Sequence, residues 1–341
     1  MAAGTGLIGV ACPATKLCVA ISDGGKVLVS ADPAAGAKAW RTVSGLTVAQ
    51  SDETLAQQRR SGQYVQYAYD LACPSTHLCV IGQPGLSSAA GSSPYDPVGS
   101  IVYSTDPLGG ASAWHTVKGI DGNRGAIQTL SCPSTHLCYA FSVGADKYGN
   151  DLDTPLVSTN PTGDSSAWRV SGPVMQDAGV VSLACKSTRL CVAAGAVLLW
   201  TTHPTGSQSQ WASVTNASGN GPFVAVSCPS IGLCIAAPEN AGCKPCGAGN
   251  DLVSTDPLAG TWHATSAATW NISCHGITLC IGPGNGEKPF PELAYSTDPA
   301  GKAWDYVSGL GKGLIVRAVS CASTRLCVGA GDDGAVVVGQ R

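Results

Sequence analysis

The sequence predicts an all-β protein, a seven-bladed β-propeller of four-stranded antiparallel blades in which a C-x5-C disulfide staples the first hairpin of each blade. Three observations predict this fold. A C-x5-C cysteine pair recurs seven times, the same four short apolar segments accompany the pairs, and the composition suits strands and turns. With 43 Gly and 21 Pro but only three Phe and two Met in 341 residues, a helix-rich core is excluded.

The cysteine pairs are the most regular part of the repeat. Fourteen of the 16 cysteines form them, and the first members of successive pairs are 43 to 61 residues apart. Two cysteines at this spacing lie opposite each other in a strand–turn–strand hairpin, within reach of a disulfide. Zinc sites favour shorter spacings and histidine partners at fixed offsets, which do not recur here.

The last two cysteines form a C-x2-C pair in a glycine-rich loop. We expect a small disulfide there as well, with a redox motif or half a metal site as the alternatives. The expected disulfides are Cys12–Cys18, Cys73–Cys79, Cys132–Cys138, Cys185–Cys191, Cys228–Cys234, Cys243–Cys246, Cys274–Cys280 and Cys321–Cys327.

The disulfides predict an oxidising compartment. Each short-loop bridge contributes about 2 kcal/mol in the chain-entropy model, and such bridges persist only outside the reducing cytosol. We therefore expect a secreted or surface-exposed protein. Residues 1–6 lack the basic start of a signal peptide, so we expect the export signal to have been removed. The longest apolar run, Val192–Trp200, is far shorter than the ~20 residues of a membrane-spanning helix, so we expect no membrane insertion.

Each repeat contains four segments with the period of a β-strand. The first ends at the first cysteine (Gln128–Cys132), and the second begins with Leu-Cys. The third is typified by Ile101–Asp106 and the fourth by Trp114–Val117. Gly, Pro, Asp and Ser separate the segments, which predicts four antiparallel strands, A to D. The chain is then a single propeller domain, 1–341, with repeats that start near residues 7, 68, 127, 180, 223, 269 and 316.

The residues before each first cysteine indicate how the blades stack. The residue two positions before it is always Val, Leu or Ile, and the residue directly before it is always Ala or Ser. An apolar face opposite a face of small side chains allows neighbouring sheets to approach closely. We therefore expect the blades to pack face to face around a ring.

The connection between strands C and D carries a recurring Ser-x-Asp…Trp pattern, as in Ser104-Thr-Asp106…Trp114. This pattern resembles the Asp-box (BNR repeat) of the sialidase-like β-propeller superfamily, and the chain resembles a secreted bacterial repeat protein of that superfamily. The Ser-x-Asp…Trp pattern is degenerate in two of the six repeats that contain it. The resemblance implies a structural role, remote from any active site, for Asp32, Asp106, Asp256 and Asp298.

The seventh repeat ends differently from the other six. It stops at Val336–Arg341 without a tryptophan strand. Blade seven therefore either keeps three strands or receives the fourth from the native chain or from a partner protein. An unpaired strand edge is a docking site for another polypeptide.

The loops divide the predicted ring into two rims. The A–B and C–D turns share one rim and are nearly constant, so we expect this rim to be scaffold. His77 and His136 lie in A–B turns where other repeats carry Lys16, Arg189 or Arg325, which indicates generic surface. The B–C and D–A loops share the other rim and vary widely in length, so we expect ligands to bind at this variable-loop rim.

Aromatic residues outside the repeat pattern concentrate on the variable-loop rim. Their faces suit stacking on sugar rings or contact with a protein partner. The candidate ligand-binding residues are Trp270, Tyr69, Tyr64, Tyr67, Tyr95, Tyr148 and Phe290.

One loop on the variable-loop rim concentrates oxygen ligands. A calcium ion there would be held by Asp146, Asn150, Asp151 and Asp153, but the spacing fits no standard calcium loop, and a solvated acidic turn is the alternative. We expect no other cofactor.

The charge balance and the missing motifs argue against several classes of function. Nineteen basic residues against 22 acidic ones exclude a nucleic-acid surface. The nine arginines, the four glutamates and the lack of a Phe/Tyr-Arg-Ile-Pro segment disfavour a sialidase, and no Gly-x-Ser-x-Gly elbow occurs. A glycosidase would need two carboxylates about 5–10 Å apart, for example Asp70 with Glu292, and nothing in the sequence brings such a pair together.

The sequence thus favours a secreted, non-catalytic binding module that recognises carbohydrate or the cell envelope through the variable-loop rim. Two alternatives stay open, since propellers support all three functions. One is a protein-interaction or targeting subunit of a secreted adhesin or toxin assembly. The other is a glycoside hydrolase or lyase.

Overall fold

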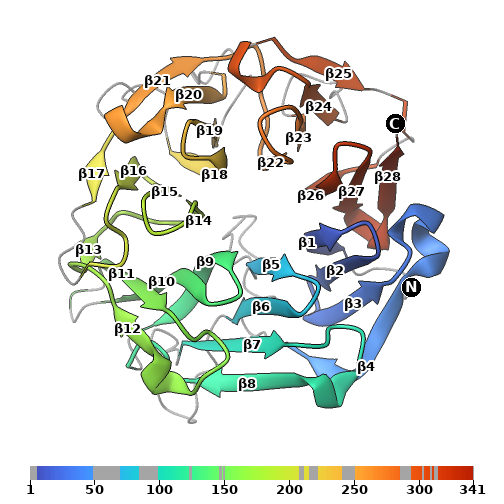
Figure 1. Cartoon of the computed structure of the whole chain (residues 1–341), viewed down its shortest axis with the longest axis horizontal. Coiled ribbons are helices and arrows are strands. Elements are labelled where there is room, and N and C mark those ends of the chain that lie inside the picture. Colours follow the sequence, from blue (N-terminus) through green and yellow to red (C-terminus); the bar gives the residue numbers. More distant parts are fainter. Residues whose placement is uncertain are drawn as a thin grey trace.

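The computed structural model of the chain is a seven-bladed β-propeller, as predicted (Figure 1). It describes residues 6–48, 70–83, 99–122, 125–145, 148, 150–206, 211–214, 222–239, 250–284, 293–301, 303–307, 309–310 and 314–340. Each blade is a separate antiparallel sheet whose strands follow chain order from the central opening outward. The strand at the opening of each blade contacts its counterparts in the two neighbouring blades, which closes the ring.

The first four blades have four strands each in the order A to D. Blade 1 comprises β1 (Leu7–Ala14), β2 (Leu17–Ser22), β3 (Lys26–Ser30) and β4 (Arg41–Thr47). Blade 2 comprises β5 (Leu71–Ser75), β6 (Leu78–Gln83), β7 (Ser100–Ser104) and β8 (Trp114–Lys118). Blade 3 comprises β9 (Ala126–Ser134), β10 (Leu137–Ala145), β11 (Asp151–Ser158) and β12 (Trp168–Val170), with β13 (Met175–Gln176) paired to β11. Blade 4 comprises β14 (Ser182–Cys185), β15 (Cys191–Ala194), β16 (Leu198–Thr201) and β17 (Ala212–Ser213).

Of the last three blades, blades 5 and 6 have four strands and blade 7 is shorter. Blade 5 comprises β18 (Phe223–Ser230), β19 (Leu233–Pro238), β20 (Leu252–Asp256) and β21 (Thr261–Ala264). Blade 6 comprises β22 (Ser273–Cys274), β23 (Cys280–Pro283), β24 (Leu293–Ser296) and β25 (Asp305–Val307). Blade 7 has three strands in the described part of the chain, β26 (Val316–Ser323), β27 (Leu326–Gly331) and β28 (Val336–Gln340).

Short 3-10 helices occupy most of the C–D turns, and one precedes β28. They are η1 (Pro33–Ala39), η2 (Ala111–Ala113), η3 (Ser165–Ala167), η6 (Pro257–Ala259), η7 (Pro299–Gly301) and η8 (Asp332–Gly334). No helix among the described residues has the length and apolarity required to cross a membrane.

The seven C-x5-C disulfides are present, one in each A–B hairpin. Their Cα–Cα distances are 3.9 to 4.1 Å. In blades 4, 6 and 7 the two cysteines are direct cross-strand partners. Cys243 and Cys246 lie outside the described residues, so their expected disulfide stays a prediction.

A serine or threonine opposite the second cysteine begins each complete C–D turn. These residues are Ser30, Ser104, Ser158, Thr201, Ser254 and Ser296. In five of them the hydroxyl oxygen accepts the N–H of the residue two positions on, at 3.1 to 3.2 Å. In blade 7 the residue opposite the second cysteine is Gly339 instead.

The aspartates of the Ser-x-Asp pattern lie within their own turns. The carboxylate of Asp106 lies against Gly109, where a Cβ would come within 2.4 Å of the Oδ2 atom, and Asp298 lies in the same way against Gly301. A larger residue would not fit beneath either carboxylate. These two aspartates therefore shape the turn.

The tryptophan that begins strand D fills the interface between two blades. Trp304 of blade 6 packs with Leu233 and Ile235 of blade 5. The other five members of this set pack in the same way on the preceding blade: Trp40, Trp114, Trp168, Trp211 and Trp262. The apolar face and the small-residue face that the sequence predicts are therefore joined by one large aromatic side chain per interface.

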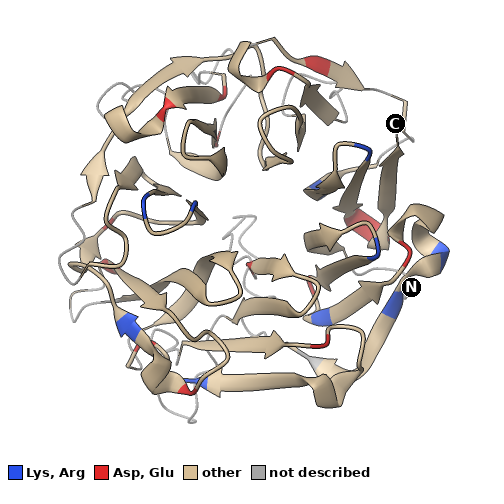
Figure 2. Cartoon of the chain, viewed as in Figure 1, with Lys and Arg blue, Asp and Glu red and all other residues tan. Residues whose placement is uncertain are grey.

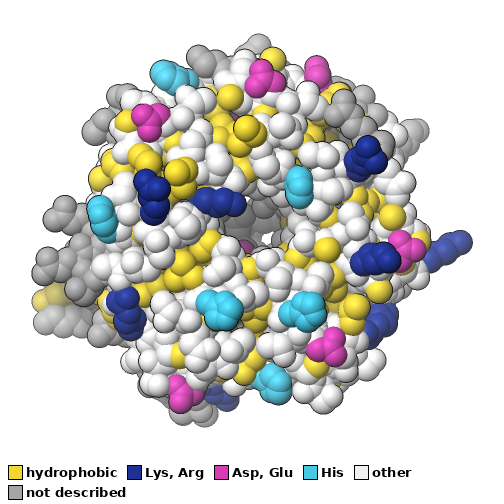
Figure 3. Space-filling model, viewed as in Figure 1, with side chains coloured by type: hydrophobic (Ala, Val, Ile, Leu, Met, Phe, Trp, Pro, Cys, Tyr) yellow, Lys and Arg dark blue, Asp and Glu magenta, His cyan; other side chains and the backbone are white. Residues whose placement is uncertain are grey.

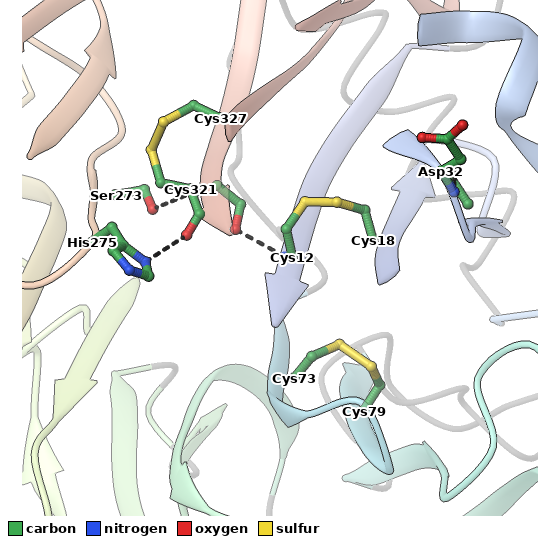
Figure 4. Close-up of a disulfide and its surroundings, with 11 residues drawn as sticks. Cys12, Cys18, Asp32, Cys73, Cys79, Ser273, His275, Cys321 and Cys327 are labelled. Carbon is green, nitrogen blue, oxygen red and sulfur yellow. Dashed lines mark hydrogen bonds between the residues drawn. A yellow bond between two sulfur atoms is a disulfide. The ribbon is translucent and has the colours of Figure 1, made fainter. Parts of the chain in front are cut away.

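The small residue before the first cysteine also has a polar role. The hydroxyl oxygens of Ser131, Ser273 and Ser320 accept the N–H of the first cysteine in the next blade, at 2.9 to 3.3 Å. Figure 4 shows two of these bonds beside the disulfides. The bond from the Cys12 N–H to Ser320 joins blade 7 to blade 1. It therefore closes the ring at its inner edge.

Candidate functional site: two rims of the ring

Most of the predicted ligand-binding residues on the variable-loop rim lie outside the described residues. These are Tyr64, Tyr67, Tyr69, Tyr95 and Phe290. The same holds for Asp146 of the predicted calcium site and for Glu292 of the hypothetical carboxylate pair. The predictions that depend on these residues stay predictions.

The two described aromatic candidates lie in different surroundings. The side chain of Tyr148 is 77% exposed. Trp270 is half-buried, and its indole N–H donates to the carbonyl oxygen of Val316 at 3.2 Å. Trp270 therefore links blade 6 to the first strand of blade 7, whereas Tyr148 is exposed.

The described part of the predicted calcium loop is tied into the scaffold. Asp153 is buried, and its two carboxylate oxygens accept the N–H groups of Gly179 and Val180 at 3.0 and 2.9 Å. Asn150 and Asp151 lie beside it at the start of β11. Among the described residues no group of three or more His, Cys, Asp or Glu is arranged to hold a metal ion.

Buried aspartates connect neighbouring blades. Asp70 accepts the hydroxyl of Thr129 at 2.6 Å and the N–H of Leu130 at 2.8 Å, both from the next blade. Asp251 accepts the N–H and the hydroxyl of Thr269 at 3.0 and 2.8 Å. Burial raises the pKa of Asp70 and raises that of Asp251 to about 7, although the hydrogen bonds act in the opposite direction. These carboxyls act as links between blades.

The A–B turns on the other rim adopt two shapes. In five blades two residues connect the strands, as between Ala14 and Leu17. In blades 4 and 6 the residue after the first cysteine, Lys186 or His275, instead donates its N–H to the leucine carbonyl at 2.7 or 2.8 Å. The residue after it then has a positive φ, 62° at Ser187 and 60° at Gly276. The tips of these two turns therefore differ in conformation from those of the other five blades.

The A–B turns together place seven basic or histidine side chains around the central opening. Figure 3 shows histidine, lysine and arginine side chains around the hole on this face, and Figure 2 shows the basic turns near the axis. We call this set the cationic ring: Lys16, His77, His136, Lys186, Arg189, His275 and Arg325. All except the half-buried His275 are exposed. The seven A–B turns, all of them described, contain no aspartate or glutamate.

Local hydrogen bonds orient the histidines of the cationic ring. The Nδ1 atoms of His77 and His136 lie 3.1 and 3.0 Å from the hydroxyl oxygen of the preceding threonine. The Nδ1 of His275 lies 3.3 Å from the carbonyl oxygen of Cys321 in the next blade (Figure 4). The Tyr139 hydroxyl of blade 3, whose pKa burial raises to about 12, donates to the carbonyl oxygen of Ser187 in the A–B turn of blade 4, at 3.4 Å. The side chains are thus presented by constrained turns.

The cationic ring has an apolar break. Blade 5 contributes no basic side chain to it, and its turn presents Ile231, which is 36% exposed. The neighbouring turn of blade 6 presents Ile277, which is 60% exposed. The aspartates of this face lie in the C–D turns, farther from the axis (Figure 2). The centre of the face is therefore basic with one apolar edge, whereas acidic and basic side chains are mixed at its periphery (Figure 3).

The cationic ring is a site that sequence reasoning missed. Six of the seven A–B turns hold one or two of these side chains, which within a single turn indicates ordinary surface. The signal was in the alignment of the repeats, because every turn but that of blade 5 carries Lys, Arg or His. Fixed cations without neighbouring acids bind anions, and an arrangement around an opening suits an extended or multivalent one.

The likeness of the chain to known proteins lies in its fold. No protein-family model matches the chain, and no curated protein matches it either. Solved structures that it resembles include YCF48 bound to D1 peptide, at a TM-score of 0.63 and 11% identity, with 100% of this chain and 94% of that chain covered. The WD40 repeats of RRP9 give 0.63 and 10%, with 100% and 96% covered. The WD40 propeller domain of Doa1 gives 0.57 and 12%, with 100% and 94% covered. At these identities the likeness is one of fold alone.

Proposed function

We propose that this propeller is a non-catalytic interaction module that holds an acidic segment of a partner protein over its central opening. The cationic ring is the observation that carries this proposal. Its lysines and arginines stand among exposed turns that contain no acid, in a chain whose formal net charge is −3. A local positive field of this kind steers and orients an anionic partner.

Two further observations support a polypeptide as the ligand. The exposed Ile231 and Ile277 lie at one edge of the ring and suit apolar side chains among the acidic ones. A propeller that resembles this chain along its whole length, YCF48, has been solved with a peptide bound. We extend that mode of use to this chain.

The test is the affinity of a fluorescent peptide of alternating Glu and Leu residues. We expect the double variant Lys186→Glu/Arg189→Glu to bind at least about tenfold more weakly, because each reversal replaces an attraction with a repulsion. The matched control is Lys38→Glu/Lys118→Glu, which makes the same charge change away from the A–B turns. Equal losses in both variants, or an affinity insensitive to salt, would contradict the proposal.

A second candidate is carbohydrate or cell-envelope recognition by the variable-loop rim. The exposure of Tyr148 favours it, because exposed aromatic side chains can stack on sugars. A glycan array should then show a ligand whose binding is lost in Tyr148→Ala. If the protein binds no glycan on the array, this candidate function is wrong.

We further propose that the protein works in an oxidising compartment, as a secreted protein. Seven disulfides support this, and among the described residues no cysteine is free. We propose no cofactor for the interaction at the cationic ring, and the calcium site near Asp153 remains a separate prediction.

A further inference from the structure

The interface between blades 6 and 7 is built differently from the other six. Each of the other six is filled by the tryptophan of strand D, which packs on strand B of the preceding blade. Between blades 6 and 7 the buried members of the apolar cluster are Leu293, Val316 and Val319, with no aromatic member among the described residues. Four half-buried side chains pack against them: Ile281, Val307, Leu314 and Val337. Trp270 bridges these two blades, but through the first residue of β26. Among the described residues, no side chain of this interface takes the place of the strand-D tryptophan.

The strand of blade 6 that faces this position is correspondingly only partly covered. Leu279 and Ile281, on either side of the second cysteine, are both partly exposed. At the same positions of the other six blades every side chain is buried. The buried counterparts are Leu17, Leu78, Leu137, Leu190, Leu233 and Leu326 before the cysteine, and Val19, Val80, Tyr139, Val192, Ile235 and Val328 after it. The six equivalent interfaces thus serve as internal controls for what is different in the seventh.

In the described part of the chain no strand pairs with the outer edge of blade 7, although η1 of blade 1 contacts β28. β28 pairs with β27 on one side only, and Figure 1 shows it as the outermost strand of its blade. Its three successive valines, Val336 to Val338, are half-buried, and the strand contains no charge and no proline. Exposed sheet edges are normally protected by such residues, because unpaired N–H and C=O groups recruit other strands.

We propose that an extended segment of a partner protein pairs with β28 as the fourth strand of blade 7 and places a tryptophan against Leu279 and Ile281. Strand addition at a free edge gives affinity through main-chain hydrogen bonds and specificity through side-chain pockets. The partner's tryptophan takes the role that Trp304 has on blade 5. This site is separate from the cationic ring, so each proposal stands without the other.

The end of β28 differs from the start of a complete C–D turn. In the six complete blades a serine or threonine opposite the second cysteine starts the turn into strand D. Blade 7 has Gly339 at this position, without a hydroxyl to accept the N–H two residues on. The Gln340 side chain instead donates to the carbonyl oxygen of Ala34 in the C–D turn of blade 1, at 3.1 Å. The strand therefore runs toward the neighbouring blade.

The size of the tryptophan, rather than its N–H group, is what the interface selects. The indole nitrogens of the six strand-D tryptophans are buried without a hydrogen-bond partner in the described part of the chain. The partner segment therefore needs a large flat apolar side chain. The residues on either side of it must be compatible with a β-strand, in which successive side chains point to opposite faces. The β8 strand of this chain already has that pattern.

The experiment adds a peptide with the sequence of residues 109–120, which carries β8, to the whole protein. Hydrogen exchange of residues 336–340 should slow as the peptide is added, because their outer N–H groups become bonded. The same peptide with Trp114→Ala should bind at least about tenfold more weakly. This comparison uses the unchanged protein and does not depend on the folding of a variant.

Two variants of the protein test where the tryptophan of the added peptide binds. Ile281→Lys should weaken binding of the β8 peptide at least about tenfold, whereas Val197→Lys, at an exposed apolar position of blade 4, should leave it unchanged. Unaltered exchange at residues 336–340 with saturating peptide, or equal effects of the two peptides, would overturn the proposal. Slowed exchange that depends on protein concentration alone would assign the edge to a second copy of the chain and also overturn it.

Discussion

Single buried carboxyls make the stability of the ring depend on pH. Burial raises the pKa of Asp251 to about 7, while a carboxyl in the unfolded chain has a pKa of about 3.9. Between these values the folded state binds a proton that the unfolded state has released. The free energy of unfolding therefore falls as the pH rises from about 4 to 7. Burial acts in the same direction on Asp70 and Asp153.

Replacing Asp251 with Asn tests this directly. The amide can still accept the Thr269 N–H and pair with its hydroxyl, but it does not ionise. We expect Asp251→Asn to show a smaller fall in Tm between pH 5 and pH 8 than the unaltered protein. Asp256→Asn, at an exposed position of the same blade, should keep the original profile. Matching profiles for Asp251→Asn and the unaltered protein would refute the assignment.

The buried aspartates could not be predicted from the sequence, because they follow no repeat. Asp70 precedes a strand A and Asp251 precedes a strand C, so the alignment gives them no common position. The 14 cysteines of the C-x5-C pairs and the six strand-D tryptophans, in contrast, are fixed to the repeat, and the seven disulfides of those pairs are confirmed. The Asp-box resemblance identified Asp106 and Asp298 as turn residues, and their carboxylates do lie within the turn.

At the scale of the blade, a disulfide stabilises each of the seven blades, and a tryptophan stabilises six of them. The disulfide joins strands A and B, and the tryptophan of strand D fills the gap to the preceding blade. The sequence predicted the hairpins because a cysteine pair marks both strands. It did not predict the serine bonds between blades, because Ala11, Ala72 and Ala184 occupy the same position without a hydroxyl.

The tryptophan interface gives a prediction for blade stability. Trp304→Ala should lower the free energy of unfolding by about 3–5 kcal/mol, because it leaves a cavity against Leu233 and Ile235. Trp304→Phe should cost less than about 1.5 kcal/mol, since it keeps most of the apolar volume and removes a buried N–H without a partner. Urea unfolding measures both. A phenylalanine variant as unstable as the alanine variant would mean that the indole N–H contributes.

At the scale of the whole molecule, ring closure creates the candidate binding surface. The bond from Cys12 to Ser320 joins residues far apart in the sequence and brings the seven A–B turns around one opening. His77, His136 and Arg325 belong to different repeats, and each looks like ordinary surface within its own turn. The expectation that this rim is only scaffold came from the constancy of its turns. That same constancy arranges the charges into a ring.

The position of an acidic ligand on the molecule is the most direct test of the proposed function. The Glu-Leu peptide, carrying a photoreactive group, would be cross-linked to the protein and the attachment points mapped by mass spectrometry. We predict cross-links in the A–B turns, at residues 15–16, 76–77, 135–136, 186–189 and 324–325. Cross-links confined to the variable-loop rim, at residues 84–98 or 285–292, would contradict the account.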